Sequence, residues 1–201
     1  MGILLSALAL RRSARIGHGL SVLAGHINRE KGNGMTSIFP GRYTAQSEEP
    51  FVVFLIGMRV NRLLALPSWT RVAAAMPPMI AELKRDPSLG LLHAQFFVYW
   101  RGVGTIQYWR SFEQLHAYAH ARNAAHLPAW AEFNRRIGGN GTVGIWHETY
   151  TVAPGQYESI YANMPRFGLG SAVPHVPVTG RLDSARARIG QTDSLEPDRK
   201  L

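Results

Sequence analysis

The chain has 201 residues, of which 46% are hydrophobic and 17% are charged, so it holds enough apolar material for a packed core and is not a disordered protein. It contains no cysteine, which excludes disulfides, thiolate metal sites and a cysteine nucleophile. The formal net charge of +9 is unevenly distributed, because residues 1–42 hold six basic residues and one acidic residue. The rest of the chain has no basic run with interleaved aromatic residues, so we predict no nucleic-acid partner.

Residues 1–34 are interpreted as an extension in front of the folded domain. The apolar residues 1–10 precede Arg11 and Arg12, which is the reverse of the order in a secretory signal peptide. Met35 begins a segment of different character, so we expect translation to start there and residues 1–34 to be untranslated or disordered. A functional anchor is the alternative. No apolar run approaches the roughly 18 residues that span a bilayer, so we predict no membrane span and a cytoplasmic location.

The apolar periodicity predicts four strands and two helical regions. In chain order these are a strand at 51–60, a helix at 69–85, strands at 89–100 and 103–110 joined as a hairpin, a helical region at 112–137 and a strand at 142–152. Residues 156–163 alternate and are expected to form an edge strand or a loop. We predict a single domain over 35–170 and a mostly disordered tail over 171–201, where the apolar pattern fades.

Local signals mark the ends of the two helical regions. Ser68 is expected to be the N-cap of the first, and Ser111 with Gln114 three residues later predicts a capping box for the second. The adjacent Pro77 and Pro78 predict a kink or a break inside the first helix.

The order strand, helix, strand, strand, helix, strand is that of a ferredoxin-like βαββαβ fold, in the α+β class. Two helices would cover one face of an antiparallel sheet and leave the other face open with large apolar residues. An open apolar face of that size is rarely left in water, so we expect a homodimer in which two sheets pair as a dimeric α/β barrel. Each subunit would have a cleft between its sheet and its helices.

Several segments resemble one protein family, namely MTSIFPGRYTAQ, EEPFVVFLIGMRVNRL, QYWRSFEQLHAYA, GIWHETYTV and YESIYANMPRFGLG. The family is named for a monooxygenase of the fumagillin biosynthetic cluster, and it is similar to the antibiotic-biosynthesis monooxygenases of the dimeric α/β-barrel superfamily. The resemblance covers residues 36–178. It implies a monooxygenase that acts on a hydrophobic or aromatic small molecule.

Two mechanisms are implied by this resemblance. Cofactor-free relatives bind an electron-rich polycyclic phenol in a dry pocket, where a base and oxyanion donors let its anion react with oxygen. Haem-using relatives place a histidine of the second helical region under the iron, which corresponds to His126 here, with His120 as the alternative. Haem is therefore the candidate cofactor, although none is required.

Relatives that degrade haem also use an asparagine on the first strand and a tryptophan on the second helix. The first corresponds to Asn61, but Tyr118 stands near the place of the tryptophan, which argues against haem degradation itself. The longer, haem-containing aldoxime dehydratases show no specific match to this sequence.

The histidines of the second helical region have further interpretations. His116 and His120 are four residues apart and share a helix face, a spacing that can bind a metal, but Glu113 is the only acid close by. We interpret them as surface histidines and predict no metal site. His126 precedes a proline-induced break, where it either faces the cleft or caps the following helical piece.

The last strand carries a polar pair. Alternation places His147 and Glu148 on opposite faces, so one of them is expected to be buried and to need a partner, for which His93 is the candidate. A histidine in an apolar pocket can act as the general base for a phenol. The alternative is a hydrogen-bonded pair that fixes the register of the strand.

Aromatic residues crowd the predicted sheet and suit a cleft for a flat ligand, although a dimer core uses the same residue types. The candidate substrate-binding residues are Trp109, Tyr118, Trp146 and Tyr99, the candidate catalytic residues are His147, Glu148, His93 and Asn61, and the candidate haem ligands are His126 and His120. A non-catalytic protein that binds a small molecule or haem is the alternative function.

Overall fold

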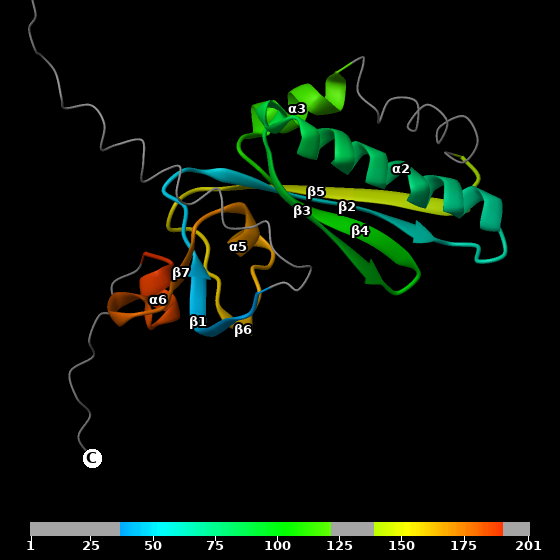
Figure 1. Cartoon of the computed structure of the whole chain (residues 1–201). Coiled ribbons are helices and arrows are strands. Elements are labelled where there is room, and N and C mark those ends of the chain that lie inside the picture. Colours follow the sequence, from blue (N-terminus) through cyan, green and yellow to red (C-terminus); the bar gives the residue numbers. More distant parts are fainter. Residues whose placement is uncertain (1–36, 122–138, 191–201) are drawn as a thin grey trace, which may run out of the picture. The chain divides into compact units, whose positions relative to one another are not determined.

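The computed structural model describes residues 37–121 and 139–190, and its main feature is an antiparallel sheet with helices on one face (Figure 1). The strands of this sheet are β2 (Phe51–Val60), β3 (Leu91–Tyr99), β4 (Gly102–Trp109) and β5 (Val143–Val152), and the helices are α2 (Leu66–Arg85) and α3 (Phe112–His120). The strand order is β3–β4–β2–β5, which is the order of a ferredoxin-like sheet. The predicted ferredoxin-like α+β fold is therefore confirmed.

The helix α2 forms because its apolar side chains repeat on one face, and Ile80 and Leu83 on that face are buried. It begins after Ala65, with Pro67 in its first turn, so the prediction of Ser68 as N-cap is wrong. Pro77 and Pro78 lie inside the continuous helix and do not break it. Each proline costs about 3 kcal/mol in a helix interior, and we attribute the continuity of α2 to the burial of its apolar face on the sheet.

The helix α3 begins at the predicted N-cap. The hydroxyl of Ser111 accepts a hydrogen bond of 3.2 Å from the backbone N–H of Gln114. The reciprocal half of the capping box is not formed, because the Gln114 side chain donates instead to the carbonyl of Ser88, in the 3₁₀ turn η1 (Pro87–Leu89). This bond joins α3 to the turn that follows α2.

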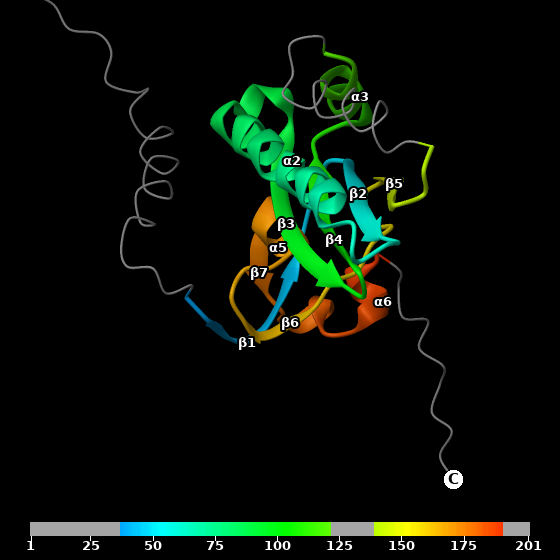
Figure 2. The same ribbon diagram turned by 90° about the vertical axis from the view of Figure 1, so that its right-hand side faces the viewer.

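A second sheet of three strands lies on the opposite side of the main sheet from α2 and α3 (Figure 2). Its order is β6 (Tyr161–Met164), β1 (Phe39–Ala45) and β7 (His175–Pro177). Ala45 and Phe51 form a core cluster with Leu169 of the short helix α5 (Leu169–Ala172), and Val53 and Tyr108 of the main sheet pack against it. The face that the sequence predicts to be open is therefore partly covered.

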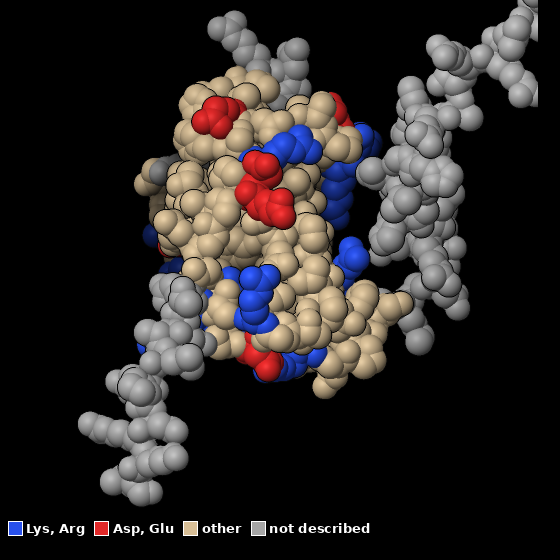
Figure 3. All heavy atoms as spheres, turned by 90° about the vertical axis from the view of Figure 1, so that its left-hand side faces the viewer, with Lys and Arg blue, Asp and Glu red and all other residues tan. Residues whose placement is uncertain are grey.

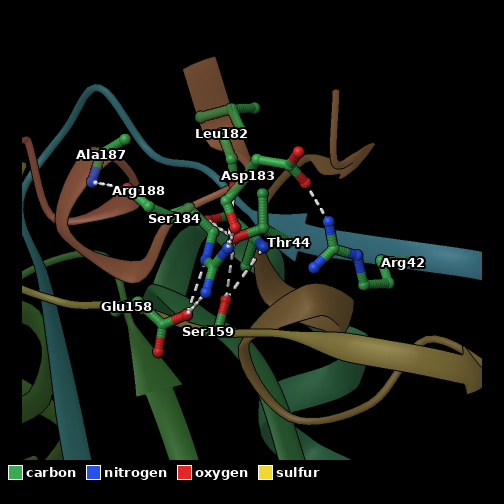
Figure 4. A network of polar contacts seen from close by, with 10 residues as sticks. Arg42, Thr44, Glu158, Ser159, Leu182, Asp183, Ser184, Ala187 and Arg188 are labelled. Atoms are coloured by element: carbon green, nitrogen blue, oxygen red, sulfur yellow. Dashed lines mark hydrogen bonds and ion pairs between the residues drawn. The ribbon is translucent and has the colours of Figure 1, made fainter. Parts of the chain in front are cut away.

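Residues 171–190 also differ from the predicted disordered tail, whereas residues 191–201 lie outside the described residues. They contain β7, the 3₁₀ turn η2 (Gly180–Leu182) and the helix α6 (Ala185–Arg188). The guanidinium of Arg188 donates to Glu158 and to the carbonyls of Leu182 and Asp183, and Asp183 pairs with Arg42 (Figure 4). The polar contacts of Arg188, whose side chain is 8% exposed, help to hold this segment. The segment has no apolar periodicity, which explains why the sequence pattern missed it.

Three aromatic rings lie over glycines on the face of the main sheet away from the helices. A Cβ atom on Gly57 would lie 2.9 Å from the ring of Trp146, and one on Gly104 would lie 2.7 Å from the ring of Phe97. Tyr99 covers Gly102 in the same way, and its hydroxyl accepts a hydrogen bond of 2.6 Å from the indole N–H of Trp146. The glycines leave the room in which these rings pack against the backbone.

We expect Gly57→Ala to lower the free energy of unfolding by about 1–3 kcal/mol, because the new methyl group would overlap the Trp146 ring. Gly144→Ala is the matched control, since a Cβ atom there would meet only Asn61 Nδ2 at 3.7 Å, an ordinary contact. Urea unfolding of both variants measures the effect. Equal losses of stability in the two variants would show that the close fit of Trp146 on Gly57 is unimportant.

Candidate functional site

A cavity of about 550 Å³ lies between the helices and the sheet. This volume is in the range of small-molecule binding pockets. The lining side chains are mainly apolar. From α2 they include Val72, Ala73, Met76, Met79, Ile80 and Leu83; from the sheet Phe54, Ile56, Met58, Phe96 and Ile145; and from α3 Leu115. The predicted cleft between sheet and helices is therefore present.

The polar side chains of the described lining are few. They are Ser68 and Arg71 of α2, Thr105, Gln107 and Trp109 of β4, and Tyr118 of α3. Such a surface favours an apolar ligand that is oriented by one or two hydrogen bonds.

The polar groups of β4 form one row, because residues two apart in a strand share a face. The indole N–H of Trp109 donates to Gln107 Oε1 over 2.9 Å, and Gln107 Nε2 donates to the Thr105 hydroxyl over 3.0 Å. All three residues are at most 4% exposed. Both bonds are made within β4 and need no partner from α2.

Tyr118 brings an acid–base pair to the other side of the cavity. Its hydroxyl donates a hydrogen bond of 2.8 Å to the Glu82 carboxylate, and its ring centroid lies 5.9 Å from that of Trp109. Burial, together with the hydrogen bond and the negative charge of Glu82, raises the pKa of Tyr118 far above its usual value. The phenol therefore remains protonated at neutral pH.

Two of the four predicted substrate-binding residues, Trp109 and Tyr118, lie together on the cavity. The other two, Tyr99 and Trp146, lie together on the opposite face of the sheet, where the Tyr99 hydroxyl also donates to the carbonyl of Met58 over 2.7 Å. They are not part of the described cavity lining.

The structure does not bring the candidate catalytic residues together. His147 and Glu148 are both exposed, so the prediction that one of them is buried is wrong. Both belong to β5, which is an edge strand, whereas His93 belongs to β3 at the other edge of the sheet. His147 pairs across the sheet with Ile56, and His93 pairs with Tyr108, so they also occupy different rows. None of the three belongs to the described cavity lining.

Asn61 lies beyond the end of β2 and has a local structural role. Its side-chain amide donates to the carbonyl of Gly141 over 3.1 Å, and its Oδ1 accepts from Arg59 over 2.6 Å. These bonds join the end of β2 to the turn before β5, and Asn61 does not line the described cavity.

The described residues give the cavity no imidazole for a haem iron. His120 is exposed, contacts the carbonyl of His116 through Nδ1 over 2.8 Å and stacks on the His116 ring at a centroid distance of 4.1 Å. It is absent from the cavity lining, and His126 lies outside the described residues. The hydroxyl of Tyr118, the remaining candidate ligand, is bonded to Glu82. The described part of the lining therefore does not fit a haem group, and the assignment of His126 stays a prediction.

The sequence analysis missed Gln107 and Thr105. The signal that points to them is the alternation T-I-Q-Y-W over residues 105–109, which places two polar residues in one row with Trp109. A polar residue on the helix-covered face of a central strand has to be satisfied or functional.

The chain is thus a ferredoxin-like α+β domain with an apolar cavity of ligand size under its helices. The model of the family described as Monooxygenase af470-like matches residues 51–169, so the chain belongs to that family. A relative named Monooxygenase af470, from Aspergillus fumigatus, is 31% identical over 176 residues, which are 80% of this chain and 61% of the fungal protein. The chain thus spans about three fifths of the length of that relative.

One solved structure supports the fold, and a second matches at a TM-score too low to support it. A crystal structure of an aldoxime dehydratase in complex with butyraldoxime matches with a TM-score of 0.52 at 16% identity, covering 70% of this chain and 43% of that chain. A dimeric ferredoxin-like protein from an uncultured marine organism matches with a TM-score of 0.30 at 17% identity, covering 52% and 96%. At these identities the likeness concerns the fold alone.

The distribution of surface charge and the apolar character of the helices relate to the predictions on nucleic acid and membranes. On the face drawn in Figure 3, Lys and Arg side chains share the surface with Asp and Glu and are separated by uncharged areas. Within residues 37–121 and 139–190, no helix combines the length and the apolar character that crossing a membrane requires.

The lowered pKa values of two partly buried histidines make the stability of the fold depend on pH. Burial and the charge of Lys84 lower the pKa of His93, and burial and the charge of Arg166 lower the pKa of His175. His175 packs among Phe39, Tyr43 and Tyr161, and its ring nitrogens have no hydrogen-bond partner among the described residues. The folded protein therefore binds protons at these sites less readily than the unfolded chain.

We expect the free energy of unfolding to be unaffected by these imidazoles above pH 6.5, their usual pKa, and to fall as the pH drops below that value. His175→Phe should reduce this acid sensitivity without lowering the melting temperature at pH 7, because it replaces an unsatisfied imidazole by an apolar ring. Thermal unfolding between pH 7 and pH 5 measures both effects, with His116→Phe at an exposed site as the control. An unchanged acid sensitivity in His175→Phe would contradict this account.

Proposed function

We propose that the protein is a monooxygenase that binds a hydrophobic or aromatic small molecule in the cavity between α2, α3 and the sheet. The observation that carries the proposal is the cavity itself, which has the volume of a ligand site and few polar side chains. The name of the fungal relative supplies the reaction class. A cavity of this kind excludes water from a reactive anion, which is what a reaction of oxygen with a bound carbanion or phenolate needs.

The proposed reaction requires no external reductant. A methylene group activated by an adjacent aromatic system is oxidised to a carbonyl, so that R₂CH₂ and O₂ give R₂C=O and H₂O. The substrate supplies all the electrons, one oxygen atom enters the product, and the other leaves as water. We derive no step through haem, because the described lining does not fit that group.

Tyr118 and Glu82 are the acid–base pair of the proposal. The Tyr118 hydroxyl belongs to the cavity lining and donates to the Glu82 carboxylate. When the tyrosine oxygen accepts a proton from the substrate, the proton of the tyrosine hydroxyl moves to Glu82. Proton transfer by a positioned group of this kind contributes a factor of about 10²–10⁴ to a rate. His147, Glu148, His93 and Asn61 have no part in this step.

Oxygen uptake with dithranol, a tricyclic phenol with an activated methylene group, tests the proposal. We expect uptake above the uncatalysed rate, with one ¹⁸O atom from ¹⁸O₂ in the product. Ala73→Trp should abolish it by filling the cavity, whereas the neighbouring exposed Ala74→Trp should not. Tyr118→Phe should slow turnover about 100-fold at similar affinity, because it keeps the ring and removes the proton path.

A protein that only binds its ligand is the competing outcome. If the native protein bound dithranol, Ala73→Trp did not, and neither took up oxygen, the protein would be a non-catalytic carrier. Equal uptake by Ala73→Trp and Ala74→Trp would show that the reaction does not occur in this cavity.

We also propose that two chains pair through the part of the sheet that the three-stranded sheet leaves uncovered. Leu55 and Ile106 pair with each other across β2 and β4, and Trp146 and Tyr99 lie on the same face. Tyr150, on this face at the edge strand, is 50% exposed. Covering such a face with an identical one is the usual way to bury it.

Analytical ultracentrifugation tests the dimer. We expect a mass twice the 22.3 kDa of the chain. Leu55→Glu should give the monomer mass, because it would bury a charge in the interface. Thr149→Glu, an exposed position on the other face of β5, is the control. A native protein that sediments at the monomer mass would overturn the proposal.

A further inference from the structure

The amide of Gln107 is held in one orientation by its neighbours. An indole N–H can only donate, so the contact of 2.9 Å with Trp109 requires the oxygen of the Gln107 amide to face Trp109. The amide nitrogen then faces Thr105 and Met76. The hydrogen bond from Trp109 therefore determines which end of the Gln107 amide is the oxygen and which is the nitrogen.

One N–H of this amide lacks a strong acceptor. The nitrogen donates to the Thr105 hydroxyl over 3.0 Å, and its other contact is the thioether sulfur of Met76 at 4.0 Å. A thioether is a weak acceptor, whereas an amide carries two donor hydrogens. Gln107 is only 4% exposed, so bulk water does not compensate well for this weak contact.

The weakly bonded N–H belongs to the cavity. Gln107 and Met76 both line it, from the sheet and from α2 respectively. The Met76 side chain is flexible and can give way to a ligand. A ligand oxygen in its place would form a normal hydrogen bond with Gln107 in surroundings that are otherwise apolar.

We propose that Gln107 binds an acceptor oxygen of the ligand, so that the cavity selects apolar ring systems that carry a carbonyl or phenolate oxygen. Thr105 and Trp109 are positioning residues, because they act on the ligand through Gln107. This inference rests on the proposed function, and it names the substrate class for that site. An N–H donor at this oxygen also stabilises the negative charge that develops there when the substrate is deprotonated.

Equilibrium dialysis with 9-fluorenone and fluorene tests the inference. These tricyclic probes have the same ring skeleton, but 9-fluorenone has a carbonyl group where fluorene has a methylene group. We expect the native protein to bind 9-fluorenone about 3- to 10-fold more tightly than fluorene, which is the usual range for one neutral hydrogen bond. In Gln107→Met the ratio should fall to about one through loss of affinity for 9-fluorenone alone. Gln107→Glu is a second variant that retains an acceptor for Trp109 but removes the N–H donors.

Gln95→Met is the matched control for the substitution. Gln95 lies on the neighbouring strand β3, pairs with Ile106 and accepts a hydrogen bond from Gly168, so it belongs to the opposite face of the sheet. This variant should keep the native ratio. Infrared spectra of ¹³C=O-labelled 9-fluorenone provide a readout independent of affinity, because the hydrogen bond should move the carbonyl band to lower wavenumber in the native protein and not in Gln107→Met.

The outcomes separate the two proposals. Equal binding of both probes to the native protein, or a preference that persists in Gln107→Met and Gln107→Glu, would overturn the role of Gln107. The cavity would still stand as the binding site if Ala73→Trp abolished binding. No binding of either probe, or full binding to Ala73→Trp, would overturn the binding site and the role of Gln107 together.

Discussion

The buried indole N–H of Trp109 is the constraint around which the helix-covered half of the protein is organised. A donor in this position needs an acceptor, and the strand supplies it two residues away, in Gln107, which is itself held by Thr105. Since β4 makes these two bonds within its own row, α2 can meet the sheet with mainly apolar side chains. The result is a cavity with an apolar wall on the helix side and a short polar row on the sheet side.

The two faces of the sheet use their aromatic residues in different ways. On the face away from the helices, Trp146 and Tyr99 lie directly over Gly57 and Gly102, and they are joined by a hydrogen bond. On the other face, Trp109 and Tyr118 stand beside an open volume. Aromatic rings that fill the space over glycines stabilise a sheet, whereas rings beside a cavity are available to a ligand.

A ferredoxin-like fold does not define a reaction, because the same architecture supports unrelated functions. The name of the family is the basis of the proposed monooxygenase chemistry, and the geometry indicates which groups would serve it. Tyr118 and Glu82 are the proposed acid–base pair, because they are joined by a hydrogen bond at the cavity, and Gln107 is the proposed amide donor. His147 and Glu148 are exposed and lie on opposite faces of β5, so they do not form a pair with each other.

The sequence by itself determined the order of strands and helices in the main sheet, the hairpin between β3 and β4, the N-cap Ser111 and the family, because these depend on local periodicity, turn residues and short motifs. It did not contain a signal for β1 and β7 of the second sheet. Alternation along β5 also sorted the residues of that strand correctly into two sets. Only the tertiary structure decided which set faces the helices and the cavity, so that Trp109 became a cavity residue and Trp146 a residue of the opposite face. The continuity of α2 through Pro77 and Pro78 and the order of residues 171–190 were likewise decided there. The physical reason is that burial of α2 on the sheet and the contacts of Arg188 join segments that are far apart in the chain, and no local pattern records them.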